Sequence, residues 1–281
     1  MKTILYATDY SRNSAAALQL AHLLAKKFDS KLIVLHVFDV PISFASPVSL
    51  SYMNKEKKLF VENRAKLRAF CTEHLGDGCE GNNISFMVDE YGSVTEGILE
   101  KALKFNVDLI AVGTKGASRV KEFLLGSTTK GLVRKATCPV LAVPEMKKIG
   151  NLETLAYATD FEQADIIAIR KLVKIAKAFD ARIKVVHITT QKEYAGDQQM
   201  EWFKEMLLQK VKYPKMEFDL LFSDDILNRL QTYLLDSDAD LLTMLERKDG
   251  GFFQAVLQDD LVQKMEGKID IPLLSYAITN L

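Results

Sequence analysis

The chain repeats itself, and this constrains its fold more than any other feature. The segment Tyr6–Asp9 recurs as Tyr157–Asp160, and His36 recurs as His187 at the same spacing from it. Four further matches keep the same order: Ala25-Lys26 with Ala176-Lys177, Phe28-Asp29 with Phe179-Asp180, Val107–Ile110 with Ala239–Leu242, and Cys138–Leu141 with Ile271–Leu274. Ordered matches indicate an internal duplication, so the fold must be built from two copies of one unit.

Each copy alternates short apolar runs with amphipathic stretches, which is typical of parallel β/α units. Strands of the first copy are predicted near 2–8, 31–38, 84–88, 107–112 and 139–143, and its helices near 13–28, 54–75, 93–105 and 127–136. Strands of the second copy are predicted near 153–159, 182–188, 215–221, 240–245 and 271–277. Unbroken apolar runs such as Leu32–Leu35 favour strands that are buried on both faces. We therefore predict an α/β fold with two tandem open parallel sheets flanked by helices, in domains 1–145 and 152–281.

Composition and charge exclude several classes of protein. Of the 281 residues, 48% are hydrophobic and 26% are charged, as in a globular protein with a sizeable core. No apolar run reaches the roughly 18 residues of a membrane span, and the N-terminus lacks a secretory signal, so we expect a cytoplasmic protein. Residues 1–144 carry 19 Lys/Arg against 14 Asp/Glu, and residues 145–281 carry 18 against 23. Neither balance indicates nucleic-acid binding, but the positive first half favours an anionic ligand.

The cysteines do not indicate a metal site. Cys71, His74 and Cys79 lie close together but match no standard zinc spacing, and three cysteines are too few for a disulfide framework. We expect reduced thiols and no bound structural metal.

A glycine pattern in the first copy predicts a phosphate site. Gly113, Gly116, Gly126 and Ser127 form G-x2-G-x9-G-S directly after the apolar run Leu109–Val112. Glycines let the main chain approach a ligand, and the N-terminus of the following helix favours an anion. The spacing matches neither a Walker P-loop nor the G-x-G-x-x-G of dinucleotide-binding folds. Taken singly, these glycines can also simply end a strand or cap a helix.

Asp9 supplies a second part of the same predicted site. It ends the first strand, and Gly113 follows the fourth, so the two should face each other where an open parallel sheet reverses its strand order. A carboxylate at that point can accept hydrogen bonds from both hydroxyls of a ribose. The combination predicts a nucleotide site in the first half.

Together these motifs resemble the universal stress protein family, in a tandem two-domain form. The resemblance rests on Ala-Thr-Asp at 7–9, His36-Val37, the glycine pattern and Cys-Pro-Val-Leu-Ala-Val-Pro at 138–144. It implies a Rossmann-like fold with strand order 3-2-1-4-5, and association of the two units through the strands at 139–143 and 271–277. It also implies that ATP or AMP binds, with or without Mg2+. The implied nucleotide-binding residues are Asp9 at the ribose, Ala7 and Thr8 at the sugar or base, Val37 and Val88 at the adenine, and Val112, Gly113, Gly116, Gly126, Ser127 and Thr128 around the phosphates.

The second copy departs from this pattern. Asp160 is kept, but counting from the fourth strand places Leu245 and Lys248 at Gly113 and Gly116, and counting back from the last strand places Asp259-Asp260 at Gly126-Ser127. An insertion between these anchors leaves the register open, and Gly250-Gly251 can stand in for one glycine. Two carboxylates at a helix start repel phosphate and cap the helix themselves. We predict that residues 153–281 do not bind ATP in the manner of the first half, and that they serve as an intramolecular pseudo-symmetric partner.

These features favour a stress-response protein that acts as a nucleotide-dependent sensor or adaptor. No activated nucleophile or oriented general base stands out, so we do not expect an enzyme beyond slow ATP hydrolysis. His36 and His187 are interpreted as strand-end residues that bond locally. The segment 39–53 is either a lid over the site or a surface loop. Two alternatives stay open: a nucleotide-free scaffold of the same fold, and a hydrolase or ligase of the wider superfamily. A homodimer of the whole chain is a further possible assembly.

Overall fold

The computed structural model describes residues 1–38, 50–81, 83–114, 126–146, 150–190, 196–246 and 271–277. The first half contains β1 (Thr3–Ala7), α1 (Arg12–Phe28), β2 (Lys31–Phe38), α2 (Leu50–Leu75), the 3-10 turn η1 (Gly76–Glu80), β3 (Ile84–Glu90), α3 (Val94–Lys104), β4 (Leu109–Gly113), α4 (Ser127–Lys135) and β5 (Val140–Val143). The second half contains β6 (Thr154–Ala158), α5 (Gln163–Phe179), β7 (Arg182–Thr189), α6 (Gly196–Lys210), β8 (Met216–Phe222), α7 (Ile226–Asp236), β9 (Leu241–Glu246) and β10 (Leu273–Ala277). Every element predicted above is present, with ends shifted by a few residues, and η1 was not predicted.

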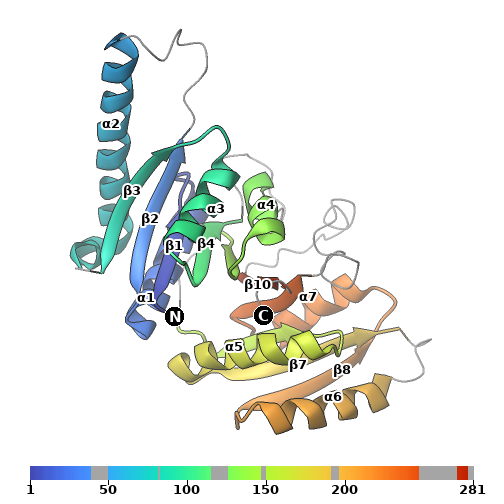
Figure 1. Ribbon diagram of the computed structural model, residues 1–281. Coiled ribbons are helices and arrows are strands. Elements are labelled where there is room, and N and C mark those ends of the chain that lie inside the picture. Colours follow the sequence, from blue (N-terminus) through green and yellow to red (C-terminus); the bar gives the residue numbers. More distant parts are fainter. Residues whose placement is uncertain are drawn as a thin grey trace.

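The strands form one ten-stranded sheet in the order β3-β2-β1-β4-β5-β10-β9-β6-β7-β8. Each half therefore has the expected order 3-2-1-4-5, and the α/β fold class is confirmed. The two expected sheets are continuous, because β5 and β10 pair side by side with Leu141 opposite Leu274. This pair is antiparallel, whereas the other pairs of described strands are parallel. The strands expected to associate are thus the ones that join the halves (Figure 1).

Helices cover both faces of the sheet and bury an apolar core on each. The first core lies under α1, α2, α5 and α6 and runs across both halves. The second core lies under α3, α4 and α7. Successive side chains of a strand point to opposite faces of the sheet and so enter the two cores in turn, which explains why the central strands are apolar throughout. Where the halves meet on the first face, the Lys27 ammonium lies 5.0 Å from the centre of the Phe179 ring.

The duplication extends to hydrogen bonds at the starts of the strands. Asp108 Oδ2 accepts the amides of Lys2 and Thr3, at 2.5 and 2.9 Å. Asp240 Oδ2 accepts the matching amides of Glu153 and Thr154, at 2.7 and 2.9 Å. A carboxylate that accepts two backbone amides ties the fourth strand of each unit to the first. The two copies therefore share their local chemistry as well as their strand order.

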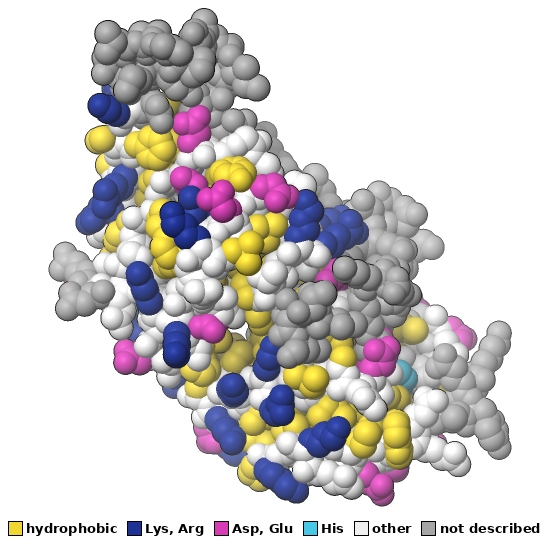
Figure 2. Space-filling model, in the orientation of Figure 1, with side chains coloured by type: hydrophobic (Ala, Val, Ile, Leu, Met, Phe, Trp, Pro, Cys, Tyr) yellow, Lys and Arg dark blue, Asp and Glu magenta, His cyan; other side chains and the backbone are white. Residues whose placement is uncertain are grey.

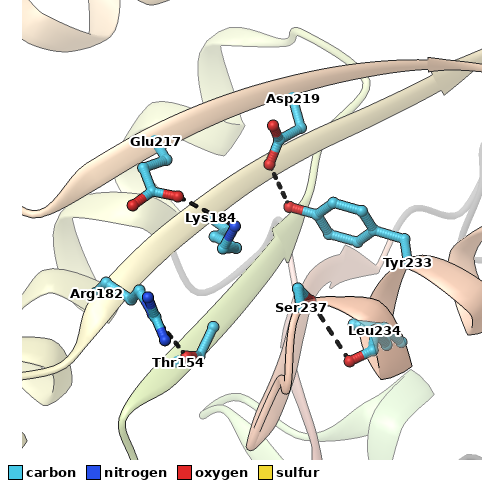
Figure 3. A network of polar contacts seen from close by, with 8 residues as sticks. All are labelled: Thr154, Arg182, Lys184, Glu217, Asp219, Tyr233, Leu234 and Ser237. Carbon is cyan, nitrogen blue, oxygen red and sulfur yellow. Dashed lines mark hydrogen bonds and ion pairs between the residues drawn. The ribbon is translucent and has the colours of Figure 1, made fainter.

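In the second half, polar contacts fasten α7 to the edge of the sheet (Figure 3). The hydroxyl of Tyr233 on α7 donates to Asp219 Oδ2 on β8 at 2.5 Å, and Lys184 on β7 pairs with Glu217 on β8 at 3.1 Å. Burial raises the pKa of Tyr233, and Asp219 adds to that effect. The hydroxyl therefore stays a donor, and it fixes the edge strand β8 under the helix.

On the face shown in Figure 2, Lys and Arg side chains are interspersed with Asp and Glu and with apolar groups. Of the helices that the structure describes, none combines the length and apolarity that a membrane crossing needs. Cys71 on α2 and Cys79 in η1 are both buried. Among the described residues, no group of three or more His, Cys, Asp or Glu is arranged to hold a metal ion.

Candidate functional site

A cavity of about 360 Å³ opens at the carboxyl ends of β1, β2 and β4, between the sheet and the starts of α3 and α4. Its lining residues are Ala7, Thr8, Asp9, Ser14, Val37, Val94, Ile98, Val112, Gly113, Gly126, Ser127, Thr128 and Thr129. It includes every predicted site residue within the described ranges except Val88. Gly116 lies outside the described residues, as do Lys115 and Arg119.

Asp9 stands at the rim of this cavity and is held from one side. Its Oδ1 accepts the Ser14 hydroxyl at 2.8 Å and the Ser11 amide at 3.1 Å. The Asp9 amide in turn donates to Ser14 Oγ at 3.3 Å. Within the described chain both bonds to the carboxylate end on Oδ1, which leaves Oδ2 for a ligand. A carboxylate oxygen placed this way can accept hydrogen bonds but cannot donate them.

Gly113 is required by packing as well as by the cavity. A Cβ at this position would lie 2.9 Å from the carbonyl carbon and Cβ of Asn13 and from the Ser14 amide nitrogen. The glycine thus lets the start of α1 lie against the end of β4. The Gly113 carbonyl also accepts the Thr129 hydroxyl at 2.9 Å, which ties β4 to α4. Its close approach to α1 was not anticipated in the sequence, where the glycine was interpreted only through the ligand or the end of the strand.

The start of α4 presents backbone N–H groups to the cavity. Gly126 is the N-cap and offers no side-chain acceptor, and the first turn contains no acidic residue. The Gly126 amide donates to the Thr114 carbonyl at 2.5 Å, which fixes the entry into the helix. The first N–H groups of a helix have no partner within it and carry partial positive charge, so they suit a phosphate or another anion.

The opposite wall of the cavity is apolar and rests on α3. Val94 and Ile98 come from α3, and Val37 and Val112 from the sheet. The helix is fastened by Lys101, whose ammonium lies 2.7 Å from Asp89 on β3. The hydrogen bond to Asp89 raises the pKa of Lys101, so the ammonium stays charged across ordinary pH. A flat apolar ring would fit against such a wall.

Val88 lies away from this wall. It pairs with His36 in the sheet and packs against the first core, on the face covered by α1 and α2. The wall belongs to the second core, on the other face. The adenine contact expected for Val88 stays a prediction that the geometry of the cavity does not support.

The two strand-end histidines bond locally, as interpreted from the sequence. His36 Nδ1 lies 2.8 Å from the Thr8 carbonyl oxygen, and His187 Nδ1 lies 2.6 Å from that of Thr159. Burial lowers the pKa of His36, and the bond to Thr8 opposes this only in part. A neutral Nδ1–H imidazole therefore donates to the backbone beside the cavity and holds the end of β1 in place.

The corresponding place in the second half is built differently. The strand register aligns Leu245 with Gly113, because Tyr6 pairs with Ala111 and Tyr157 with Thr243. Leu245 is 3% exposed and belongs to the first core. The alignment predicted for this residue is confirmed, whereas Lys248 and Asp259-Asp260 lie outside the described residues.

Four lining residues were missed in the sequence: Ser14, Val94, Ile98 and Thr129. Val94 and Ile98 stand one turn apart at the start of α3, which could have indicated a shared face. Ser14 gave a different signal, because it aligns with Asp165 at the offset that relates the two copies. Thr129 follows the glycine motif directly and was within reach of the same argument.

Known proteins match the chain over one half in sequence and over its full length in fold. A family model described as the universal stress protein family matches residues 1–144. A universal stress protein of Methanocaldococcus jannaschii is 30% identical over 157 residues, which are 52% of this chain and 84% of that protein. One of Thermus aquaticus is 32% identical over 143 residues, which are 50% of this chain and 98% of that protein.

Solved structures extend the likeness of fold to both halves. A universal stress protein from Archaeoglobus fulgidus superposes with a TM-score of 0.66 at 16% identity, over 98% of each chain. A Pseudomonas aeruginosa protein of unknown function superposes with a TM-score of 0.67 at 15% identity, over 99% of this chain and 94% of that one. The likeness of fold thus extends over nearly the full length of the chain.

Proposed function

The chain belongs to the universal stress protein family, and from that premise we propose that its first half binds an adenine nucleotide, ATP or AMP. In this proposal the protein is a cytoplasmic sensor or adaptor of a stress response whose state depends on the bound nucleotide. The observation that carries the proposal is the cavity beside Asp9 and the start of α4. It joins an apolar wall, an exposed carboxylate and an uncapped helix N-terminus within about 360 Å³.

Each part of the cavity suits one part of a nucleotide. The wall at Val37, Ile98 and Val112 suits the base, and Asp9 Oδ2 suits the ribose hydroxyls. The start of α4 suits the phosphates, with the hydroxyls of Ser127 and Thr128 beside them. A Mg2+ ion usually binds through one or two carboxylates together with substrate phosphates, so it would enter here with the nucleotide.

Asp9→Asn tests the proposal with little risk to the fold. The amide oxygen can keep the bonds from Ser14 and Ser11, while its NH2 group cannot accept from a ribose. Calorimetry should give one ATP per wild-type chain, and an affinity that is about tenfold to a hundredfold lower in the variant. Asp160→Asn, the matched change in the second half, should leave binding unchanged.

Equal heats for wild type and Asp9→Asn would contradict the assigned ribose contact. An absence of binding by the wild type would favour the nucleotide-free scaffold instead. A stoichiometry of two ATP per chain would contradict the restriction to the first half. Substitution of Gly113 is a poorer test, because a side chain there would displace the start of α1.

We further propose that the nucleotide acts by binding rather than by turnover. The cavity pairs an apolar wall with a carboxylate that is already engaged through Oδ1, and its hydroxyls lie at a helix start, which suits retention of a ligand. Phosphate release measured over hours with saturating ATP should stay at or below about one turnover per minute, far under the usual range of enzymes. Turnover near one per second would overturn this part of the proposal.

A further inference from the structure

The two halves differ at one buried position in the first turn of their first helix. Ser14 is the third residue of α1 and is 2% exposed, and Asp165 is the third residue of α5 and is 1% exposed. The neighbours on the strand are matched, since Tyr6 and Thr8 correspond to Tyr157 and Thr159. The same position is therefore occupied by a serine in the first half and by an aspartate in the second, with matched neighbours on the strand.

In the first half, the serine holds the aspartate at the end of the strand. The Ser14 hydroxyl donates to Asp9 Oδ1 at 2.8 Å and accepts the Asp9 amide at 3.3 Å. The Ser11 amide donates to the same Oδ1 at 3.1 Å. These bonds fix the carboxylate of Asp9 through Oδ1, and Asp9 is an exposed residue that lines the cavity.

In the second half, Asp165 on the helix is the acceptor of the local hydrogen bonds. Asp165 Oδ1 accepts the Tyr157 hydroxyl at 2.8 Å. Its Oδ2 accepts the Thr159 hydroxyl at 2.8 Å, the Asp160 amide at 3.2 Å and the Glu162 amide at 3.0 Å. The Glu162 amide corresponds to that of Ser11, so the loop donor has moved from the aspartate of the strand to the aspartate of the helix.

We propose that Ser14 is a positioning residue that makes the first half competent for a ribose-bearing anion, and that Asp165 makes the second half incompetent irrespective of which residues follow β9. This inference rests on the proposed nucleotide site. A serine hydroxyl can donate to Asp9, whereas a carboxylate in its place can only accept. The carboxylate also adds a second negative charge where an anionic ligand must approach.

Ser14→Asp tests the inference by transplanting the second half's residue into the first. The variant should fold, because the same aspartate is accommodated between a matched tyrosine and threonine in the second half and favours a helix N-terminus. Its urea midpoint should equal or exceed that of the wild type. Its affinity for ATP should fall by at least about tenfold, because like charges at this range repel.

Thr72→Asp is the matched control for charge. It adds the same charge to an exposed position on α2, on the face of the sheet away from the cavity, and should leave the affinity for ATP unchanged. A folded Ser14→Asp variant with wild-type affinity would overturn the inference. An equal loss in Thr72→Asp would also overturn it, because the effect would then come from net charge alone.

Ser14→Ala separates positioning from a merely structural effect. We compare ATP with 2′,3′-dideoxy-ATP, which lacks the hydroxyls that Asp9 would accept. The wild type should prefer ATP by about tenfold, and Ser14→Ala should reduce that preference by about threefold or more, because Asp9 loses its donor. A structural role would weaken both ligands equally and leave the ratio unchanged, which would overturn the inference.

The failure of this inference can be distinguished from failure of the proposed function. ATP binding by the wild type that Ser14→Asp and Ser14→Ala both leave intact overturns this inference alone. An absence of ATP binding by the wild type overturns the proposed function and this inference with it.

Discussion

The two halves share strand order, the Asp108 and Asp240 ties and the strand-end histidines, but they differ at the end of the fourth strand. In the first half Gly113 lets the start of α1 approach β4, and a cavity opens beside it. In the second half Leu245 stands at the same register and is buried in the core. The same strand position thus holds a glycine that lets α1 approach closely in one half and a leucine that packs in the first core in the other.

The largest expected effect concerns the buried leucine at the end of the fourth strand of the second half. Leu245→Ala should lower the free energy of unfolding by about 2–5 kcal/mol, because it leaves a void in a packed core. Urea denaturation measures it, with Leu235→Ala as a control: that leucine is 71% exposed and its loss should cost about 0.5 kcal/mol or less. A loss under about 1 kcal/mol for Leu245→Ala would show that this end of the second half is loosely packed.

A smaller effect on stability is expected at the matching glycine of the first half. Gly113→Ala should lower the free energy of unfolding by about 1–3 kcal/mol, since its methyl group would lie 2.9 Å from the backbone of Asn13 and Ser14. Gly92→Ala is the matched control, because nothing lies within 4 Å of its Cβ position. The control should be neutral or slightly stabilising. If the two alanine variants were equally stable, the close approach of α1 to β4 would be wrong.

The smallest expected effect concerns the residue two positions before the last strand of each unit. Burial raises the pKa of Cys138 to about 12, and the matching residue in the second half is Ile271. A raised folded pKa means that the wild type loses stability as pH rises above the unfolded value of about 8.5, because only the unfolded thiol ionises. Cys138→Ile removes this dependence.

The stability difference between wild type and Cys138→Ile should therefore shift by about 1 kcal/mol in favour of the variant from pH 8.5 to 9.5. Urea denaturation at several pH values measures the shift, and the variant's own packing change cancels because it does not depend on pH. Parallel stability curves would contradict the assigned burial of the thiol.

Much of the fold was predictable because strands and helices each leave a characteristic pattern of apolar residues in the sequence. The buried runs and amphipathic stretches located the described strands of both halves and the four α-helices of the first half, and the duplication predicted their grouping. Ends were less predictable: the strand expected from residue 107 begins at Leu109, because Asp108 is used to accept the amides of β1. Such a bond joins residues far apart in the chain and leaves no local pattern.

The residues of the candidate site that belong to a sequence motif were predictable. Those whose role depends on a distance between side chains were not. Asp9, Gly113 and the start of α4 follow from spacing and from the rule for open parallel sheets, and they line one cavity. The role of Ser14 depends on its distance from Asp9, and a single serine in a helix gives no periodic signal. The contrast between Ser14 and Asp165 was visible in the repeat, but its meaning required the hydrogen bonds.

The pairing of β5 with β10 has a consequence for the growing polypeptide. During synthesis β5 is complete at residue 143, while its partner strand ends at residue 277. At usual rates of translation the ribosome needs on the order of ten seconds for the stretch between them. For that time the first unit carries an unpaired strand edge at what will become the middle of the sheet. An unpaired edge invites pairing with other nascent chains, and the four residues of β5 keep it short.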